Sequence, residues 1–144
     1  MRVESPVLCV LLAWITGCAA PSVGGGDGVM DAGEVPQVGW TATLETRAHG
    51  TSGTAVVVDE STIELRDFVY DGQGIDARLF LQADGAAFSG DYELTESLVG
   101  DAFEGDLLTL PIPDQAELEN WNLITLWCVP AGASFGDGVF LPPE

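Results

Sequence analysis

Apolar and polar residues alternate mostly with a period of two from residue 39 to the end of the chain, and turn-forming residues interrupt the alternation every eight to twelve positions. This pattern is typical of short strands that bury one face. It predicts an all-β fold, and we expect a single antiparallel β-sandwich or barrel-like domain of about 7–8 short strands. The expected strands are residues 40–46, 54–58, 62–68, 77–82, 90–94, 107–112, 123–129 and 138–141.

The residues between these strands have specific turn chemistry. Asp59, Glu60 and Ser61 separate two β-rich segments in the way of a tight hairpin. Residues 71–74 and 84–85 combine aspartate with glycine, which adopts a positive φ without strain. Residues 114–120 are expected to form one helical turn, with Asp114 as its N-cap.

A short apolar run, residues 6–15, is followed by Thr16, Gly17 and Cys18. Roughly ten residues at about 1.5 Å each cover about half of the ~30 Å hydrocarbon core, so the run is a signal-peptide core and not a spanning helix. The order resembles the lipobox of bacterial lipoproteins, in which a signal peptidase cuts before the cysteine and the cysteine receives a diacylglyceryl group.

This resemblance implies a cleaved signal peptide at 1–17, lipidation of Cys18 and an extracytoplasmic protein that is lipid-anchored to a bacterial membrane. Ala19 stands where an aspartate would resemble an inner-membrane retention signal, which favours the outer membrane. The alternative is an ordinary cleaved secretory peptide in which Cys18 occurs by chance. Two or three acyl chains on one cysteine are enough for stable anchoring.

Residues 18–36 are rich in glycine and acidic residues, and we expect them to be a flexible tether to a folded domain at 37–144. Asp27, Asp31 and Glu34 within the tether offer an alternative reading as calcium ligands, although they lack the spacing of an EF-hand loop. All of the predicted strands lie in residues 37–144.

The chain carries 23 acidic residues, four arginines and no lysine, for a net charge of −19. Such a surface repels phosphate backbones and anionic head groups, so nucleic acid is not an expected partner. We expect the lipid anchor to be the membrane contact, a redox or surface protein to be a possible partner, and the protein to be a monomer because acidic copies repel. The 47% hydrophobic content and the patterned apolar runs after Pro36 predict a folded domain there in spite of the acidity.

Several motifs follow one another in a fixed order along the expected domain. They are residues 49–55 (HGTSGTA), 65–72 (LRDFVYDG), Gly74, Asp76–Ala77, 123–128 (LITLWC) and Phe135–Gly136. This succession resembles the DM13 domain over about residues 39–141. Ile75 and Ala131 depart from the family pattern, which usually has proline and an aromatic residue there.

The resemblance implies that Cys128 is the near-constant cysteine of the family. It also implies a role in extracellular electron transfer or in oxidative modification of surface molecules, a role proposed for domains that sometimes stand beside haem-binding DOMON domains. Cys128 is the only free thiol expected in the mature protein, because Cys9 is removed and Cys18 is acylated.

Period-two alternation places Cys128 on the strand face of Leu126 and Ile124, opposite Trp127. If that face is the core, we expect an unreactive thiol with a raised pKa. A reactive thiolate instead needs a positive neighbour, for which the mature chain offers Arg47, Arg66, Arg78 and His49.

Metal ligation is a further hypothesis for Cys128. A thiolate together with the imidazole of His49 would suit copper or a haem iron, and the alternative for His49 is a solvent-facing turn residue. Asp71 and Asp76, near Asp67, are candidate ligands for a hard cation such as calcium, and the alternative is an Asx turn.

No nucleophile elbow, HExxH, P-loop or dinucleotide fingerprint occurs in the sequence, which gives no support for hydrolase, kinase or dehydrogenase chemistry. We therefore expect a non-enzymatic, membrane-anchored redox or electron-transfer accessory that acts through Cys128. The alternative is a non-catalytic cell-surface binding or structural module in which Cys128 is buried as packing.

Overall fold

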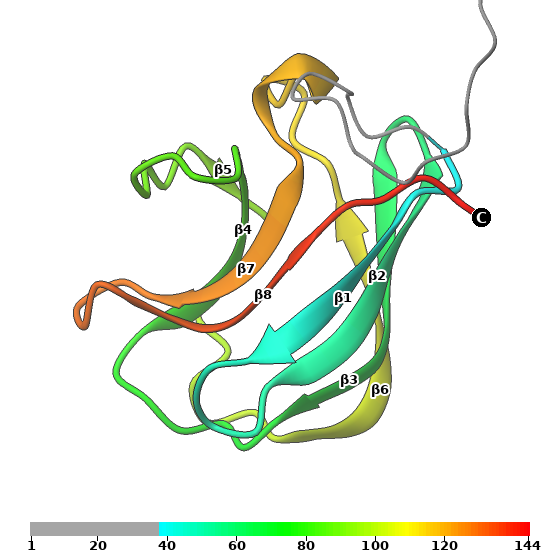
Figure 1. Cartoon of the computed structure of the whole chain (residues 1–144). Coiled ribbons are helices and arrows are strands. Elements are labelled where there is room, and N and C mark those ends of the chain that lie inside the picture. The colour runs from blue at the N-terminus through cyan, green and yellow to red at the C-terminus, as the bar shows by residue number, and fades with distance from the viewer. Residues whose placement is uncertain (1–37) are drawn as a thin grey trace, which may run out of the picture.

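Eight antiparallel strands form one curled sheet in the computed structural model, which describes residues 38–144 (Figure 1). The strands are β1 (Thr41–Thr46), β2 (Ser52–Asp59), β3 (Thr62–Tyr70), β4 (Ala77–Gln82), β5 (Tyr92–Glu93), β6 (Phe103–Pro111), β7 (Leu123–Cys128) and β8 (Ala133–Val139). Their order in the sheet is β5-β4-β7-β8-β1-β2-β3-β6. The all-β prediction is confirmed, and the only helical element in residues 38–144 is the 3₁₀ turn η1 (Leu118–Asn120).

Strand β1 joins the two halves of the sheet. It pairs with β2 along Thr41–Leu44 and with β8 through Glu45 and Thr46, so the sheet can curl around a single core. The inward residues of both halves are buried in that core; they include Leu44, Val57, Ile63, Leu65, Phe68, Tyr70, Leu79, Leu81, Ile124, Leu126 and Phe140. Their apolar burial is the main source of the fold's stability.

Strands β1 and β8 approach each other so closely that β8 needs glycine. A Cβ atom on Gly138 would lie 2.4 Å from the carbonyl oxygen of Thr43, and one on Gly136 would lie 2.7 Å from Cγ2 of Thr51. The first contact is with backbone and cannot be relieved by a side-chain rotation. Gly138 is therefore required by close backbone packing, and Gly136 leaves room for the side chain of Thr51.

A β-bulge changes the phase of β3. Leu65 and Phe68 are both fully buried, although an unbroken period of two would place Asp67 and not Phe68 on the inner face. The register with β6 shifts between Leu65 and Phe68, and Asp67 adopts a positive φ of 52° there. The extra residue turns Tyr70 into the core.

Two local expectations were wrong. The last strand runs over Ala133–Val139 and not over 138–141, because its glycines, which resemble a loop in sequence, are the residues that β1 packs against. The helical turn is confined to Leu118–Asn120 and follows Glu117 without a side-chain cap, so Asp114 is not its N-cap. The hairpin prediction is confirmed, since Oδ1 of Asp59 accepts a hydrogen bond of 2.8 Å from the Ser61 amide.

The expected signal peptide, Cys18 and the tether lie outside the residues that the structure describes. Within residues 38–144, no helix is both long enough and apolar enough to cross a membrane.

Candidate functional site: a buried thiol faced by backbone amides

Cys128 is the last residue of β7, and its side chain points into the core. It pairs with Ala77 of β4 and with Ala133 of β8, and the residue is only 1% exposed. The prediction that it shares a face with Leu126 is confirmed, because Leu126 is fully buried. Trp127 points the opposite way and stacks on Phe88, with ring centroids 4.3 Å apart. Cys128 is therefore closed to bulk solvent.

The surroundings of the sulfur are nevertheless polar. Burial raises the pKa of the Cys128 thiol, but the backbone N–H groups of Asp76, Ile75 and Ala131 face the sulfur and together lower that pKa by more. The pKa therefore lies below its ordinary value, although the negative charge of Asp76 opposes the shift. The expectation of a raised pKa for a core thiol was wrong, because the backbone supplies the positive dipoles.

None of the four cationic side chains proposed from the sequence is responsible for this shift. The three amides belong instead to two connections: Ile75 and Asp76 lie between β3 and β4, and Ala131 lies in the β7–β8 turn. The amide of Val129 donates a 2.9 Å hydrogen bond to the carbonyl of Asp76, and the amide of Gly132 donates a 3.0 Å bond to the carbonyl of Cys128. These bonds hold both connections beside the sulfur.

Asp76 is held by an arginine and is not free to bind a cation. Arg78 donates from Nε and Nη2 to the two carboxylate oxygens at 2.8 and 3.0 Å, and its Nη1 is 3.1 Å from Glu93. The hydrogen bonds from Arg78 hold the pKa of Asp76 below its usual range. Arg78 thus neutralises the carboxylate of Asp76, a residue whose backbone amide faces Cys128.

Tyr70 is a member of the site that the sequence analysis did not single out. Its hydroxyl donates a 2.5 Å hydrogen bond to the carbonyl of Gln73. Burial, and then the charges of Asp71 and Cys128, raise the pKa of this phenol to about 12. The signal available in the sequence was its position in the FVYDG motif, but only the bulge in β3 turns it towards the thiol.

His49 lies in the β1–β2 turn with a positive φ of 56°, and its imidazole packs 4.2 Å from the ring of Phe135. Its Nδ1 is 3.1 Å from Oδ2 of Asp71. Oδ1 of Asp71 also accepts the Gln73 amide at 2.9 Å, which is the Asx-turn arrangement. Burial raises the pKa of Asp71, but the bonds from Gln73 and His49 lower it by more.

These pairs place the candidate metal ligands in separate interactions. Asp71 is bound to His49, Asp76 is bound to Arg78, and Asp67 is on the exposed bulge. Within the part of the chain that the structure describes, no three His, Cys, Asp or Glu side chains are grouped so that they could hold a metal ion. Cys128 is only 1% exposed, and the His49 ring is already packed on Phe135 and hydrogen-bonded to Asp71. The two residues therefore do not fit a copper or haem site, and we derive no step through such a group.

The motifs of the sequence analysis meet around this site. Gly74 lies beside two of its aromatic rings, since a Cβ there would be 3.1 Å from Cε2 of Phe135 and 3.5 Å from the hydroxyl of Tyr70. His49 contacts the same ring from the β1–β2 turn, and Cys128 reaches the site from β7. Residues that are far apart in sequence thus come together around the rings of Tyr70 and Phe135.

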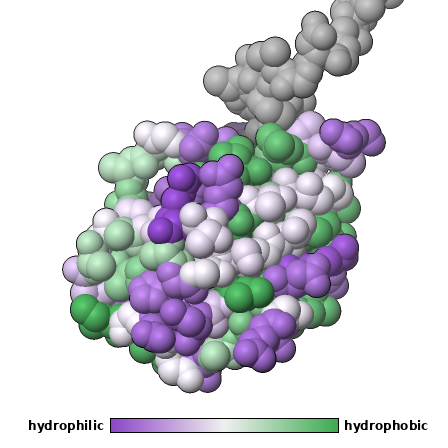
Figure 2. Space-filling view, turned by 60° about the horizontal axis from the view of Figure 1, so that its bottom comes forward, coloured by the Kyte–Doolittle hydropathy of each residue, from purple (hydrophilic) through white to green (hydrophobic). Residues whose placement is uncertain are grey.

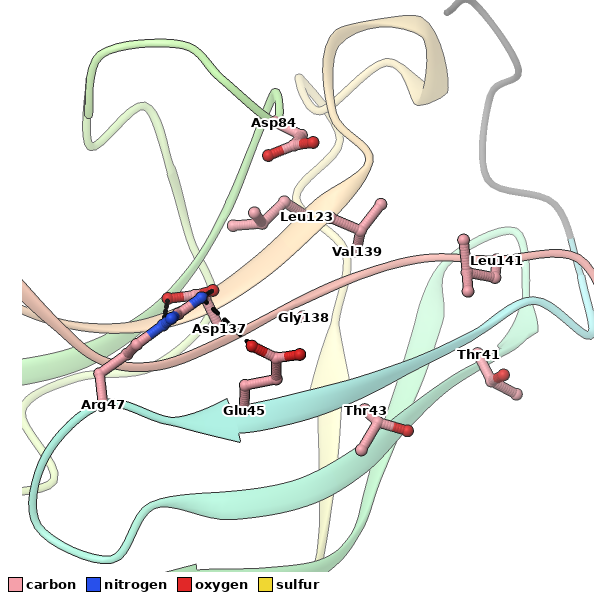
Figure 3. Close-up of a pocket in the computed structure, with 10 residues that line it drawn as sticks. All are labelled: Thr41, Thr43, Glu45, Arg47, Asp84, Leu123, Asp137, Gly138, Val139 and Leu141. Atoms are coloured by element: carbon pink, nitrogen blue, oxygen red, sulfur yellow. Dashed lines mark hydrogen bonds and ion pairs between the residues drawn. The ribbon is translucent and has the colours of Figure 1, made fainter. Parts of the chain in front are cut away.

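The cavities on the surface of residues 38–144 include one beside the site and one on another face. One, of about 410 Å³, adjoins the site and is lined by His49, Gly50, Val69, Tyr70, Asp71, Ala102, Phe103 and Glu104. The other, of about 430 Å³, lies on the outer face of β1, β7 and β8 (Figure 3). In the second cavity Arg47 is already paired with Asp137 at 3.0 Å and with Glu45 at 3.4 Å, which leaves no free cation for an anionic ligand.

The comparisons with known proteins agree with the motif order. Residues 43–140 match the family described as "Electron transfer DM13". Protein Skeletor of Drosophila melanogaster, isoforms B/C, is 29% identical over 102 residues, which cover 67% of this chain and 13% of that protein. Isoforms D/E are also 29% identical over 102 residues, which make up 7% of their length.

No solved structure matches the chain. The matched region nevertheless runs from β1 to the end of the described sheet and contains each residue of the thiol site. The chain belongs to the DM13 family of electron-transfer domains.

Proposed function

We propose that this protein is a membrane-anchored extracytoplasmic lipoprotein whose DM13 domain takes part in electron transfer through Cys128. The family supports a redox-related domain. The finer assignment rests on the backbone amides of Ile75, Asp76 and Ala131, which lower the pKa of the buried thiol. A thiolate is the form of cysteine that is oxidised or attacks another sulfur, so this arrangement prepares Cys128 for a change of oxidation state.

A second candidate function is a non-catalytic binding or structural module. The observation that favours it is the 1% exposure of Cys128, since a sealed thiol in an apolar strand face also serves as packing. Packing alone does not explain why three amide groups converge on the sulfur. The two functions make different predictions for the reactivity of the native thiol.

The test is alkylation of the native full chain by iodoacetamide between pH 6 and 10, followed by mass spectrometry. Cys9→Ser and Cys18→Ser leave Cys128 as the only thiol. We expect the rate to rise with pH around a midpoint below the pKa of an unperturbed cysteine thiol. A thiol that reacts only at denaturant concentrations that unfold the domain would establish the packing module instead.

Ile75 allows a matched pair of variants. Ile75→Pro removes one N–H donor to the sulfur, because proline has no amide hydrogen, and it places at this position the residue that the family pattern usually has. Ile75→Val keeps the donor and changes only an exposed side chain. We expect the proline variant to raise the midpoint of alkylation and the valine variant to leave it unchanged; equal midpoints would contradict the amide argument.

The anchor needs a separate experiment in a bacterium that processes lipoproteins. We expect the wild-type chain to incorporate labelled fatty acid and to fractionate with the outer membrane, because acyl chains on one cysteine give stable anchoring. Cys18→Ser is expected to lose both the label and the membrane association. Secretion of an unlabelled wild-type chain would show that residues 1–17 are an ordinary secretory peptide.

A further inference from the structure

The loops that face Cys128 with their backbone carry apolar side chains on their outer side. Ile75 is 74% exposed and Val129 is 44% exposed, and Pro130 and Ala131 beside Val129 are also exposed. The hydrogen bond of 2.9 Å from the Val129 amide to the carbonyl of Asp76 joins the two loops. These four side chains form what we call the Cys128 apolar surface.

This surface is separated from the sulfur by little more than one layer of backbone. The amides of Ile75 and Ala131 face the thiol, while the side chains of the same residues face solvent. A protein that covers these side chains therefore stands next to the thiol without entering the core. Apolar side chains that are exposed next to one another can mark an interaction site.

The rest of the described surface is strongly acidic. Residues 38–144 contain nineteen acidic residues and three arginines. Ion pairs join these arginines and His49 to six of the acids: Arg47 to Glu45 and Asp137, Arg66 to Glu64, Arg78 to Asp76 and Glu93, and His49 to Asp71. The other thirteen have no ion pair with another described residue. Figure 2 shows one face of the molecule, on which hydrophilic and apolar residues are interspersed.

We propose that the Cys128 apolar surface is the docking site of a basic protein whose contact face has an apolar centre ringed by lysine or arginine. The apolar centre would cover Ile75 and Val129, and the basic ring would meet the acidic surface of the domain, on which thirteen carboxylates have no ion pair with another described residue. The proposal rests on the proposed function for its purpose, since the docked protein would be the redox partner of Cys128. A second copy of this chain is excluded as the occupant by its own charge.

The test is a ¹⁵N NMR titration of the full chain that carries Cys9→Ser and Cys18→Ser, with short amidated peptides as probes. The peptides are Lys-Lys-Trp-Trp-Lys-Lys, its acidic counterpart Glu-Glu-Trp-Trp-Glu-Glu and the non-aromatic Lys-Lys-Ser-Ser-Lys-Lys. We expect only the first peptide to shift the amide signals of Ile75, Val129 and Ala131. Because the attraction is between exposed charges, its affinity is expected to fall about fivefold between 20 and 200 mM salt.

Two variants locate the contact. Ile75→Ser is expected to weaken binding of the basic aromatic peptide by about tenfold, the effect of removing one buried aliphatic side chain. Leu107→Ser is the matched control, because Leu107 is also exposed but lies on β6, at the other edge of the sheet order from β4 and β5. Equal losses in the two variants, or equal binding of the acidic peptide, would overturn the proposal.

Vesicles of zwitterionic phosphatidylcholine test a membrane as the occupant. If they shift the Ile75 and Val129 signals and the basic peptide does not, the surface contacts lipid and our proposal is wrong. The result of this titration can be told apart from that of the alkylation test. If Cys128 is reactive but the peptide does not bind, only the proposed docking site is wrong. If the peptide binds but the native thiol is inert, only the proposed redox function is wrong.

Discussion

The phenol of Tyr70 and the thiol of Cys128 are electrostatically linked, although they come from β3 and β7. Burial is the largest cause of the raised phenol pKa of about 12, and the charges of Asp71 and Cys128 add to it. The sulfur ionises first, so the phenol loses its proton beside an existing negative charge. The two groups therefore resist being ionised together.

This link predicts a pH titration. We expect Cys128→Ala to lower the pKa of Tyr70 by less than about one unit, because the larger effect of burial remains. The measurement is the absorbance of tyrosinate near 295 nm in a Tyr92→Phe background, in which Tyr70 is the only tyrosine. If the titration curve is the same in both proteins, the charge of the thiolate has no effect on the pKa of the phenol.

Arg78 is expected to act on Cys128 through Asp76. Its hydrogen bonds of 2.8 and 3.0 Å neutralise a carboxylate whose charge raises the pKa of the thiol. We expect Arg78→Gln to raise the alkylation midpoint of Cys128. Arg66→Gln is the control, because Arg66 pairs only with Glu64 among the described residues and should leave the midpoint unchanged. A lower midpoint in Arg78→Gln would contradict this role.

Substitutions of Asp67 test the bulge that turns Tyr70 inward. Its φ of 52° is left-handed, a conformation that glycine adopts freely and β-branched residues adopt only with strain. We expect Asp67→Gly to change the free energy of unfolding by less than about 0.5 kcal/mol or to raise it, and Asp67→Val to lower it by about 1–2 kcal/mol. Urea unfolding measures both. A valine variant as stable as the wild type would mean that the bulge is not required.

Asp137 gives a prediction for acid stability. The hydrogen bonds from Arg47 are the largest cause of its lowered pKa; burial opposes them and Ser134 adds to them. Because the folded pKa is below the unfolded value, the ionised carboxylate stabilises the fold above about pH 4. That contribution is lost as the pH falls through the folded pKa.

Asp137→Asn is therefore expected to lower the free energy of unfolding by about 1 kcal/mol at pH 7. Near pH 2, where the carboxylate is protonated, we expect the free energies of unfolding of the variant and the wild type to be nearly equal. Denaturant unfolding at several pH values measures the difference. The control is Asp114→Asn, at an exposed residue without an ion pair in the described region, which should change stability little at pH 7. A constant difference at all pH values would show that Asp137 acts by packing and not by charge.

Much of the fold could be predicted from the sequence, because alternation along a strand is a local property. The strand at Ala77–Gln82 has the expected bounds, and the face that carries Cys128 follows from the apolar residues at Ile124 and Leu126. The order of the motifs also identified the family, which the comparison confirms over residues 43–140. Such features need no knowledge of what lies opposite each strand.

The chemistry of the site depended on the tertiary structure. Burial of Cys128 suggested a raised pKa, but the donors that lower it are the amide N–H groups of Ile75, Asp76 and Ala131. Every residue except proline has such an N–H group. No side-chain pattern in the sequence marks which amides converge on one sulfur. The same is true of Tyr70, whose direction depends on one extra residue in β3.

The sequence by itself therefore determined the β architecture, the acidic surface and the cysteine of interest, since these follow from residue type and spacing. Only the folded chain decided that the β3–β4 connection and the β7–β8 turn meet at the sulfur, that His49 pairs with Asp71, and that Arg78 pairs with Asp76. The physical reason is that the charge state of a buried group depends on nearby dipoles and partners in space. In a sheet of this order, those neighbours come from strands that are distant in sequence.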